Sequence, residues 1–360
     1  MSGNTFGRIL RLTTFGESHG PAIGGILDGC PAGLPLDEAE IQQELDLRKP
    51  GTGPASTRRK ESDTVRLLSG VFNGLTTGTP IGFMIANADH RSADYGNLAD
   101  VFRPGHADWP YFRKYRGIRD HRGGGRASGR ETACRVAGGA IAQKILAAAC
   151  GASILAACVE LGGVACENID LENARSRPYF AACDAAPELW DAAVANAARS
   201  GDTLGGIVRV AARGIPAGLG EPVFDKLDAR LAYALMGVGA VKGVEIGSGF
   251  GAAGLGGSAN NDQIYPGESP ERPRFGSNNA GGILGGISTG QEILLNVAVK
   301  PIASISQLQH TVNLRGEAAE LRIGGRHDLS AIPRIVPVLV AMTALTLADA
   351  LILQKRMDVI

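Results

Sequence analysis

The chain has 360 residues, of which 20% are charged and 44% hydrophobic, and its formal net charge at neutral pH is zero. This composition is typical of a globular protein, and the neutral balance argues against binding to nucleic acid or a membrane surface. Aromatic residues make up only 5% of the chain, so an RNA-binding module is the weakest of the function classes considered. Because no repeat or composition break marks a linker, we expect one domain over residues 1–360.

The first third of the chain reads mostly as strands. Residues 36–47 are the exception, because they form an amphipathic helical pattern that Asp37 is placed to cap. Residues 49–62 are rich in glycine, proline and basic side chains, which predicts a loop. The predicted strands cover residues 6–12, 22–27, 65–72 and 80–86.

Residues 87–125 are polar, rich in arginine and poor in regular periodicity. A helix is then predicted over residues 131–150. Ser128 and Glu131 have the spacing of a capping box at its start, and Gly151 ends it.

Helices and strands follow in the second half, but not in a regular βαβ order, which favours an α+β fold. Residues 335–353 are long and apolar enough to cross a bilayer, yet they include Pro337 and Asp349, so we interpret them as a buried core helix. A polar loop is predicted over residues 258–282. The predicted helices cover residues 186–199, 225–236 and 335–356, and the predicted strands cover 207–212, 243–246 and 292–299.

The cysteines and histidines show no metal-binding spacing. The six cysteines form no CxxC pair and stand among apolar residues, which predicts buried, reduced thiols. The six histidines lack HxH and HxxxH spacing, so no metal site is expected. The N-terminus has no apolar segment of the signal-peptide kind, which predicts a cytoplasmic protein.

A concentrated positive patch lies between Arg103 and Arg135, which has nine basic and three acidic side chains. Guanidinium groups bind carboxylates and phosphates with two parallel hydrogen bonds, and glycines such as those at 123–125 let backbone amides approach a ligand. The patch therefore predicts a site for a small molecule with several negative charges, and a solvated charged surface is the alternative.

Two histidines, His19 and His106, lie in glycine-containing turns beside charged residues, where they could exchange protons near neutral pH. An incidental place in a turn is the alternative for each. The glycines of residues 249–254 match the GxGxxG spacing, but no helix is predicted to follow, so we expect no dinucleotide-binding fingerprint there.

Six segments of this chain resemble the chorismate synthase family, and they occur in the family's order along nearly the whole sequence. They are GESHGPAIGGILDGCP at 16–31, RPGHAD at 103–108, GRASGRETACRVAGG at 125–139, VKGVEIG at 241–247, AGGILGGISTG at 280–290 and GRHD at 325–328.

The resemblance implies a lyase of the shikimate pathway that makes chorismate, a precursor of aromatic amino acids. Phosphate would leave 5-enolpyruvylshikimate 3-phosphate by an anti-1,4-elimination that uses reduced FMN without net redox change. It also implies helices packed between antiparallel sheets, usually in a homotetramer. NADPH in members that reduce their own flavin and a separate flavin reductase are two alternative sources of reduced flavin.

The resemblance assigns roles to individual residues. His19 is similar to the histidine that protonates the departing phosphate, His106 to the one that acts near flavin N1, and Asp328 to the carboxylate that relays a proton with flavin N5. Ser18 and Ser128 match serines that support this network. The implied flavin contacts are Arg126, Ala127, Ser128, Gly239, Ala240, Gly285, Lys300, Pro301, Ile302, Ala303, Ser304 and Arg326.

Arg48 lies where the family binds substrate or NADP. Two positions depart from the family's usual pattern: Pro54 replaces a frequent arginine, and Leu329 replaces a smaller residue or proline. A flavin-dependent oxidoreductase acting on an anionic small molecule is the alternative function, because a flavin pocket alone does not fix the reaction.

Overall fold

The structure, a computed structural model, describes residues 3–49, 55, 63–87, 99–324 and 328–357. One antiparallel sheet is built from the N-terminal part of the chain, in the strand order β1-β2-β3-β7-β4. Ile81, Phe83 and Ile85 of β7 alternate toward the core, as expected for a strand with one buried face. The strands are β1 (Thr5–Phe6), β2 (Arg11–Gly16), β3 (Ala22–Asp28), β4 (Val65–Leu67) and β7 (Ile81–Ala86).

A second five-stranded antiparallel sheet has the order β11-β16-β10-β8-β9. Three of its strands confirm sequence predictions, whereas β8 was not predicted, because its alanines and cysteine have little strand preference. The strands are β8 (Ser153–Leu161), β9 (Val164–Ala165), β10 (Gly206–Arg213), β11 (Val241–Ile246) and β16 (Ile293–Val299).

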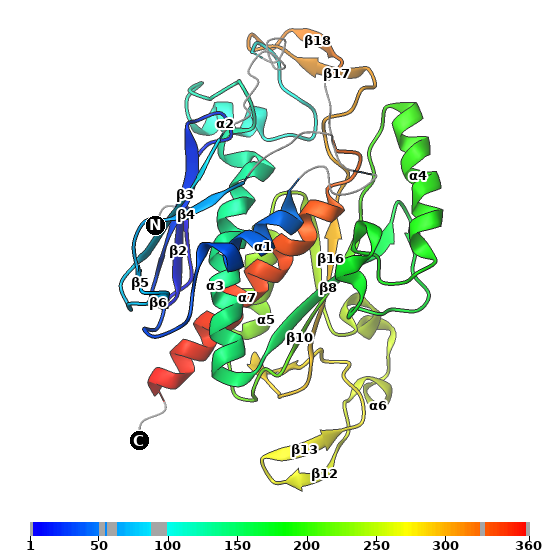
Figure 1. Cartoon of the computed structure of the whole chain (residues 1–360). Helices are drawn as coiled ribbons and strands as arrows, with labels where there is room; N and C mark the ends of the chain where they lie inside the picture. The colour runs from blue at the N-terminus through cyan, green and yellow to red at the C-terminus, as the bar shows by residue number, and fades with distance from the viewer. Residues whose placement is uncertain (1–2, 50–54, 56–62, 88–98, 325–327, 358–360) are drawn as a thin grey trace.

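Four helices lie between these two sheets (Figure 1). α3 packs along α7 in the centre, α1 and α3 contact the N-terminal sheet, and α5 and α7 contact the second sheet. This arrangement confirms the predicted α+β fold, with helices packed between antiparallel sheets. The helices are α1 (Glu38–Arg48), α3 (Thr132–Cys150), α5 (Leu227–Met236) and α7 (Ile332–Met357).

The ends of α1 and α3 show two predicted caps. Asp37 accepts a hydrogen bond from the Glu40 amide at 2.9 Å, and the Glu40 carboxylate accepts one from the Asp37 amide at 3.2 Å. Together they form the reciprocal capping box of α1. Gly151 ends α3 with a φ of 67°, a left-handed conformation that glycine adopts without strain.

α7 is the main core helix of the protein. Within the part of the chain that the structure describes, two helices, residues Gly129–Cys150 and Ile332–Met357, are long and apolar enough to cross a membrane by length and composition. The most apolar window of Ile332–Met357 is 89% buried inside the protein, which confirms the prediction of a core helix.

Asp349 explains why the strand predicted over residues 6–12 is interrupted. This buried carboxylate of α7 accepts hydrogen bonds from the backbone amides of Arg8, Ile9 and Leu10 at 3.0, 2.7 and 2.9 Å. The amides that would have continued a strand ladder therefore bind a side chain more than 300 positions away. Arg230 of α5 also pairs with Asp349, so one carboxylate joins three parts of the fold.

α3 and α7 approach closely at Gly139. A Cβ added there would lie 2.3 Å from Ala341 Cβ and 2.4 Å from Ala341 Cα, so backbone would have to move. We expect Gly139→Ala to lower the free energy of unfolding by about 1–3 kcal/mol, the usual cost of overpacking a core, in denaturant titrations. Gly138→Ala is the matched control, because its Cβ would meet only the Leu12 side chain, at 3.0 Å. An equal loss in both variants would contradict this explanation.

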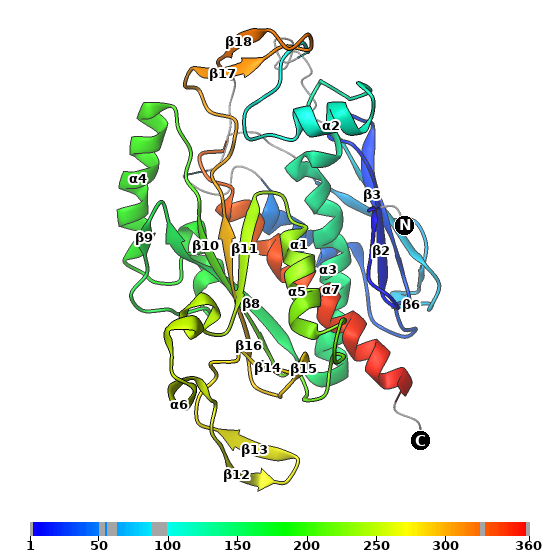
Figure 2. The ribbon, with the colours of Figure 1, turned by 180° about the vertical axis from the view of Figure 1, so that it is seen from behind.

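Several smaller elements complete the fold. The loop predicted over residues 258–282 was wrong in part, because β12 and β13 form a hairpin there that projects from the body (Figure 2). The strand predicted over 65–72 is broken by Gly70, whose φ is 83°. The remaining elements are β5 (Val71–Phe72), β6 (Leu75–Thr76), α2 (Asp108–Lys114), η2 (Gly125–Ala127), η3 (Gly129–Glu131), η4 (Ala174–Ser176), η5 (Pro178–Phe180), α4 (Ala186–Ser200), η6 (Gly249–Gly254), α6 (Gly257–Asn260), β12 (Ile264–Ser269), β13 (Arg272–Phe275), β14 (Ile283–Leu284), β15 (Ile287–Ser288), β17 (Gln309–Val312) and β18 (Ala318–Leu321).

All six cysteines are free thiols. Cys30, Cys134 and Cys158 are buried as predicted, whereas the other three are partly exposed, so the prediction of burial was wrong for half of them. Burial raises the pKa of Cys30 to about 11 and that of Cys134 to about 12, which keeps both thiols protonated at neutral pH.

Candidate active site

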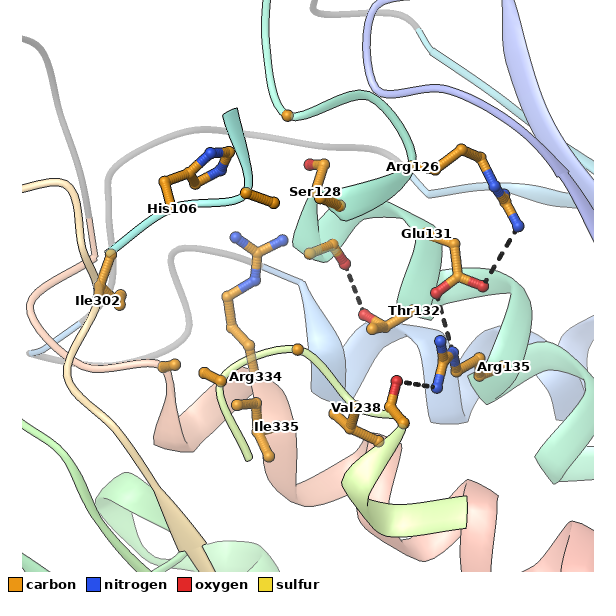
Figure 3. A pocket seen from close by; sticks show the side chains of 18 of the residues that line it. His106, Arg126, Ser128, Glu131, Thr132, Arg135, Val238, Ile302, Arg334 and Ile335 are labelled. Atoms are coloured by element: carbon orange, nitrogen blue, oxygen red, sulfur yellow. Dashed lines mark hydrogen bonds and ion pairs between the residues drawn. The ribbon is translucent and has the colours of Figure 1, made fainter. Parts of the chain in front are cut away.

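A cavity of about 760 Å³ opens where the start of α3, the start of α7 and the segment joining α5 to β11 meet. Its volume lies in the upper part of the roughly 300–1,000 Å³ range of ligand pockets. Figure 3 shows His106, Ser128 and Arg334 around one part of this cavity, with Arg126 and Arg135 further along it. The cavity therefore gathers side chains from distant parts of the sequence.

The glycine-rich turn before α3 places Ser128 in the cavity wall. A Cβ on Gly124 would lie 3.1 Å from the Ser128 backbone, so a larger residue there would push the turn slightly apart. The Ser128 hydroxyl accepts a hydrogen bond from the Arg130 amide at 3.2 Å and caps η3, not α3. The predicted capping box with Glu131 was therefore wrong, because the Glu131 carboxylate binds other partners.

Glu131 holds two arginines against the cavity. Its carboxylate accepts hydrogen bonds from Thr14 Oγ1 at 3.0 Å and Arg135 Nε at 2.9 Å, and it lies 3.9 Å from Arg126 Nη2. Arg126 also donates to Thr14 Oγ1 at 2.7 Å, and Arg135 donates to the Gly237 carbonyl at 2.9 Å. Two guanidinium groups share one carboxylate, so this wall keeps a net positive charge that suits an anionic ligand.

His106 lies in a short loop that an ion pair closes. Asp108 accepts hydrogen bonds from Arg103 Nε at 2.7 Å and Arg103 Nη2 at 2.8 Å, and His106 Nδ1 lies 2.9 Å from Asp108 Oδ1. Burial alone would raise the pKa of the Asp108 carboxyl, but its hydrogen bonds with Arg103 and His106 outweigh burial and lower that pKa far below its usual value. Asp108 is therefore ionised throughout the neutral range.

Asp328 and Arg334 form a second ion pair in the cavity. Arg334 Nη1 donates to Asp328 Oδ2 at 3.1 Å, and both side chains are mostly buried. In Figure 3 the guanidinium of Arg334, on the first turn of α7, points toward Ser128. Asp328, Ser128 and His106 thus line the same cavity.

The run from Lys300 to Ser304 lines another wall, beside Gly239 and Ala240. The Lys300 amide donates to the Ala240 carbonyl at 2.9 Å, which ties the two segments together. Burial, followed by repulsion from Lys242, lowers the pKa of Lys300. Its ammonium group contacts the carbonyls of Gly105 and Pro301 at 3.3 Å each, and among the described residues it forms no ion pair. An anionic group at this wall would stabilise the charged form of Lys300.

Ser18 and His19 adjoin the cavity without lining it. Ser18 Oγ lies 3.1 Å from His19 Nδ1, and both side chains pack against Gly123, where an added Cβ would lie 2.3 Å from His19 Nδ1. Gly124, the next residue, does line the cavity. Ser18 and His19 therefore contact the residue that precedes Gly124 of the cavity wall.

Arg48 and Gly285 also lie outside the cavity lining. The Arg48 side chain is buried and donates to Asp63 Oδ2 at 2.8 Å, Thr132 Oγ1 at 3.0 Å and the Gly129 carbonyl at 2.7 Å. It thereby supports the turn that carries Ser128. Gly285 lies in the β14–β15 turn with a φ of 61°. Arg326 and Pro54 lie outside the described residues, so neither is placed.

Sequence reasoning did not single out three side chains of the site. Asp108 was noted only as an acid opposing an arginine-rich stretch, and Glu131 only as such an acid and as a capping-box partner of Ser128. Each nevertheless binds a catalytic candidate or a cavity arginine. Arg334 precedes a long apolar segment, and its charge at the start of that buried helix was the available signal.

The two sheets, the helical layer and a cavity rich in cations and proton-transfer groups define an α+β enzyme for an anionic substrate. The family model for chorismate synthase matches residues 10–352. A chorismate synthase of Desulfovibrio desulfuricans is 69% identical over 361 residues, covering 99% of each chain, and one of Nitratidesulfovibrio vulgaris is 62% identical over 357 residues, again covering 99% of each. A crystal structure of a chorismate synthase has a TM-score of 0.78 and 34% identity, covering 97% of this chain and 93% of that one.

The chain belongs to the chorismate synthase family. Members of this family are carbon–oxygen lyases that act on a phosphate ester in the shikimate pathway. The family assignment confirms the resemblance drawn from the six sequence segments.

Proposed function

We propose that this protein converts 5-enolpyruvylshikimate 3-phosphate into chorismate and phosphate, with reduced FMN bound in the cavity. The observation that carries the proposal is that His106, Ser128 and Asp328 line the same cavity. These residues come from three distant segments, yet all three line one cavity.

The charges of the cavity suit the proposed substrate, which has two carboxylates and a phosphate. Arg126, Arg135, Arg334 and Lys300 supply four cations along the wall, and Glu131 supplies one of the opposing carboxylates. Guanidinium groups bind carboxylate and phosphate with two hydrogen bonds, so anions entering this space would find matched donors.

The cavity also fits a flavin beside the substrate. The cavity volume is larger than that of a small acidic substrate alone. Part of the wall has an aliphatic surface, formed by Leu12, Val238, Ile335 and Met342. We propose that Arg126, Ala127, Ser128, Gly239, Ala240 and the run 300–304 hold the cofactor. Reduced FMN, when bound, supplies electron density to the breaking C–O bond and accepts the ring hydrogen.

The protein's own side chains would handle protons around these ligands. We propose that His106 exchanges a proton with the flavin through Nε2, and that an Asp328 carboxylate oxygen takes and returns one. Arg334 would keep Asp328 oriented through its hydrogen bond at 3.1 Å. His19, supported by Ser18 at 3.1 Å, would protonate the departing phosphate, and Ser128 Oγ would support the network.

Three further residue assignments stay predictions. Arg48 is proposed to contact substrate or NADP, although in this structure it is bonded to Asp63, Thr132 and Gly129. Gly285 and Arg326 are proposed as flavin contacts on the family resemblance alone.

The protein's broader setting is proposed from the family. We propose a single domain over residues 1–360 that assembles as a homotetramer in the cytoplasm. A separate flavin reductase would supply reduced FMN, and NADPH used by the protein itself is the alternative.

An anaerobic assay with chemically reduced FMN and substrate tests the function. We expect chorismate and phosphate to appear in equal amounts over many turnovers, with flavin still reduced at the end. Absence of phosphate release would refute the proposal. NADPH consumption in step with product would instead indicate a flavin-dependent oxidoreductase.

Lys300→Met tests the proposed flavin site. Losing one charge-assisted hydrogen bond costs about 1.5–3 kcal/mol, so we expect the dissociation constant for FMN to rise about 10- to 100-fold. Isothermal titration calorimetry measures this change. Lys355→Met, at the C-terminal end of α7, is the control and should bind FMN as the parent does. Equal affinity in both variants would remove Lys300 from the site.

A further inference from the structure

We propose that Asp108 is a positioning residue for His106, which fixes the imidazole in the tautomer that carries its proton on Nδ1 and presents Nε2 to the cavity. This inference extends the proposed function, because it names a residue that acts through the histidine assigned to the flavin. The loop between Arg103 and Asp108 holds the two side chains in this arrangement.

The loop is a small, closed unit. Asp108 Oδ2 accepts from the Arg103 backbone amide at 3.1 Å and from Arg103 Nε at 2.7 Å, while Oδ1 accepts from Arg103 Nη2 at 2.8 Å. The His106 amide donates to the Arg103 carbonyl at 3.3 Å, and Gly105 makes the turn with a φ of 68°. His106 is therefore held at both its backbone and its ring.

Arg119 restrains the same carboxylate from a second direction. Arg119 Nη1 lies 3.6 Å from Asp108 Oδ1, and Arg119 Nη2 donates to the carbonyls of Ala99 and Val101 at 2.9 and 3.3 Å. The Arg119 guanidinium also lies 5.6 Å from the centre of the Phe102 ring. Asp108 is thus buried between two arginines, and its orientation toward His106 is fixed from outside the loop.

The ionisation of Asp108 decides the tautomer. A carboxylate has acceptors and no donor, so a neutral His106 at 2.9 Å must place its proton on Nδ1. Nε2, on the opposite side of the ring, has no hydrogen-bond partner among the described residues. Nε2 therefore faces the cavity with a lone pair when the ring is neutral and with a proton when the ring is charged. The same pairing of carboxylate and histidine orients the base in serine proteases.

NMR of protein labelled with ¹⁵N in its histidine rings tests the tautomer directly, with neither flavin nor substrate present. The His106 signals are assigned by their loss in His106→Gln. We expect the parent at pH 8 to show Nδ1 protonated and Nε2 unprotonated. The reverse pattern in the parent protein would overturn the proposal, and it would do so whether or not the protein releases phosphate.

Two variants separate positioning from simple closure of the loop. Asp108→Asn removes the charge, and its amide can donate as well as accept, so we expect the Nδ1–H tautomer to lose its dominance and kcat to fall at least about 10-fold. Arg103→Lys weakens closure of the loop but leaves the carboxylate, so the tautomer should stay as in the parent.

The two variants give opposite patterns under the two explanations. If Asp108 acts only by closing the loop, one of two results is expected. Either Asp108→Asn keeps the Nδ1–H tautomer, or Arg103→Lys loses that tautomer as fully as Asp108→Asn does. Each of these results would overturn the proposal. If Asp108→Asn does not fold, the parent and Arg103→Lys spectra still decide. Failure of the proposed function would appear separately, as absent phosphate release by the parent.

Discussion

Replacing His106 with alanine is expected to lower kcat by about 10²- to 10⁴-fold, the usual contribution of a positioned acid–base group. The side chain lines the cavity with Ser128 and Asp328, and its hydrogen bond with Asp108 leaves Nε2 for proton transfer. Stopped-flow absorbance under anaerobic conditions, with reduced FMN and saturating substrate, measures the change.

The loss should be far larger in turnover than in folding. His106 is 20% exposed, and its side chain forms one hydrogen bond among the described residues, to Asp108, so its removal leaves the core intact. His310→Ala is the control, because His310 is 85% exposed on β17 and lies away from the cavity lining. Turnover equal to the parent in His106→Ala would remove this histidine from the mechanism.

Asp349→Ala is expected to lower the free energy of unfolding by about 3–5 kcal/mol, the cost of breaking a buried ion pair from one side. The substitution leaves the amides of Arg8, Ile9 and Leu10 without their acceptor and Arg230 without its carboxylate. Urea titration followed by circular dichroism gives the value.

Asp225→Ala is the matched control for this prediction. Asp225 pairs with Arg8, beside the same backbone segment, but the two side chains are 42% and 48% exposed. Exposed pairs contribute little, so the control should unfold close to the parent. Similar losses in the two variants would show that Asp349 does not hold the N-terminal segment against α5 and α7.

The predictable parts of the fold were those set by neighbouring residues. Asp37 and Glu40 cap α1 across three positions, and Gly151 ends α3 through its own backbone conformation, so both signals are local. The break in the first strand was not predictable, because the acceptor for its amides, Asp349, lies near the other end of the chain. A sequence pattern contains no information on which distant side chain competes with a strand partner.

The same distinction applies to the site. The arginine-rich stretch predicted an anionic ligand because the type and density of its residues determine that chemistry. The partners of those arginines depend on the tertiary fold. Glu131 does not form the expected capping box, because its carboxylate accepts hydrogen bonds from Thr14 and Arg135. Arg334 lines the cavity because α7 begins at the cavity wall.

A structure of the full chain with FMN and substrate bound is the most direct test of the proposed site. We expect the flavin between His106 and Asp328, its phosphate near Lys300, and the substrate against the flavin with its charged groups at the cavity arginines. Ligands bound elsewhere, with His106, Ser128 and Asp328 contacting neither molecule, would contradict it.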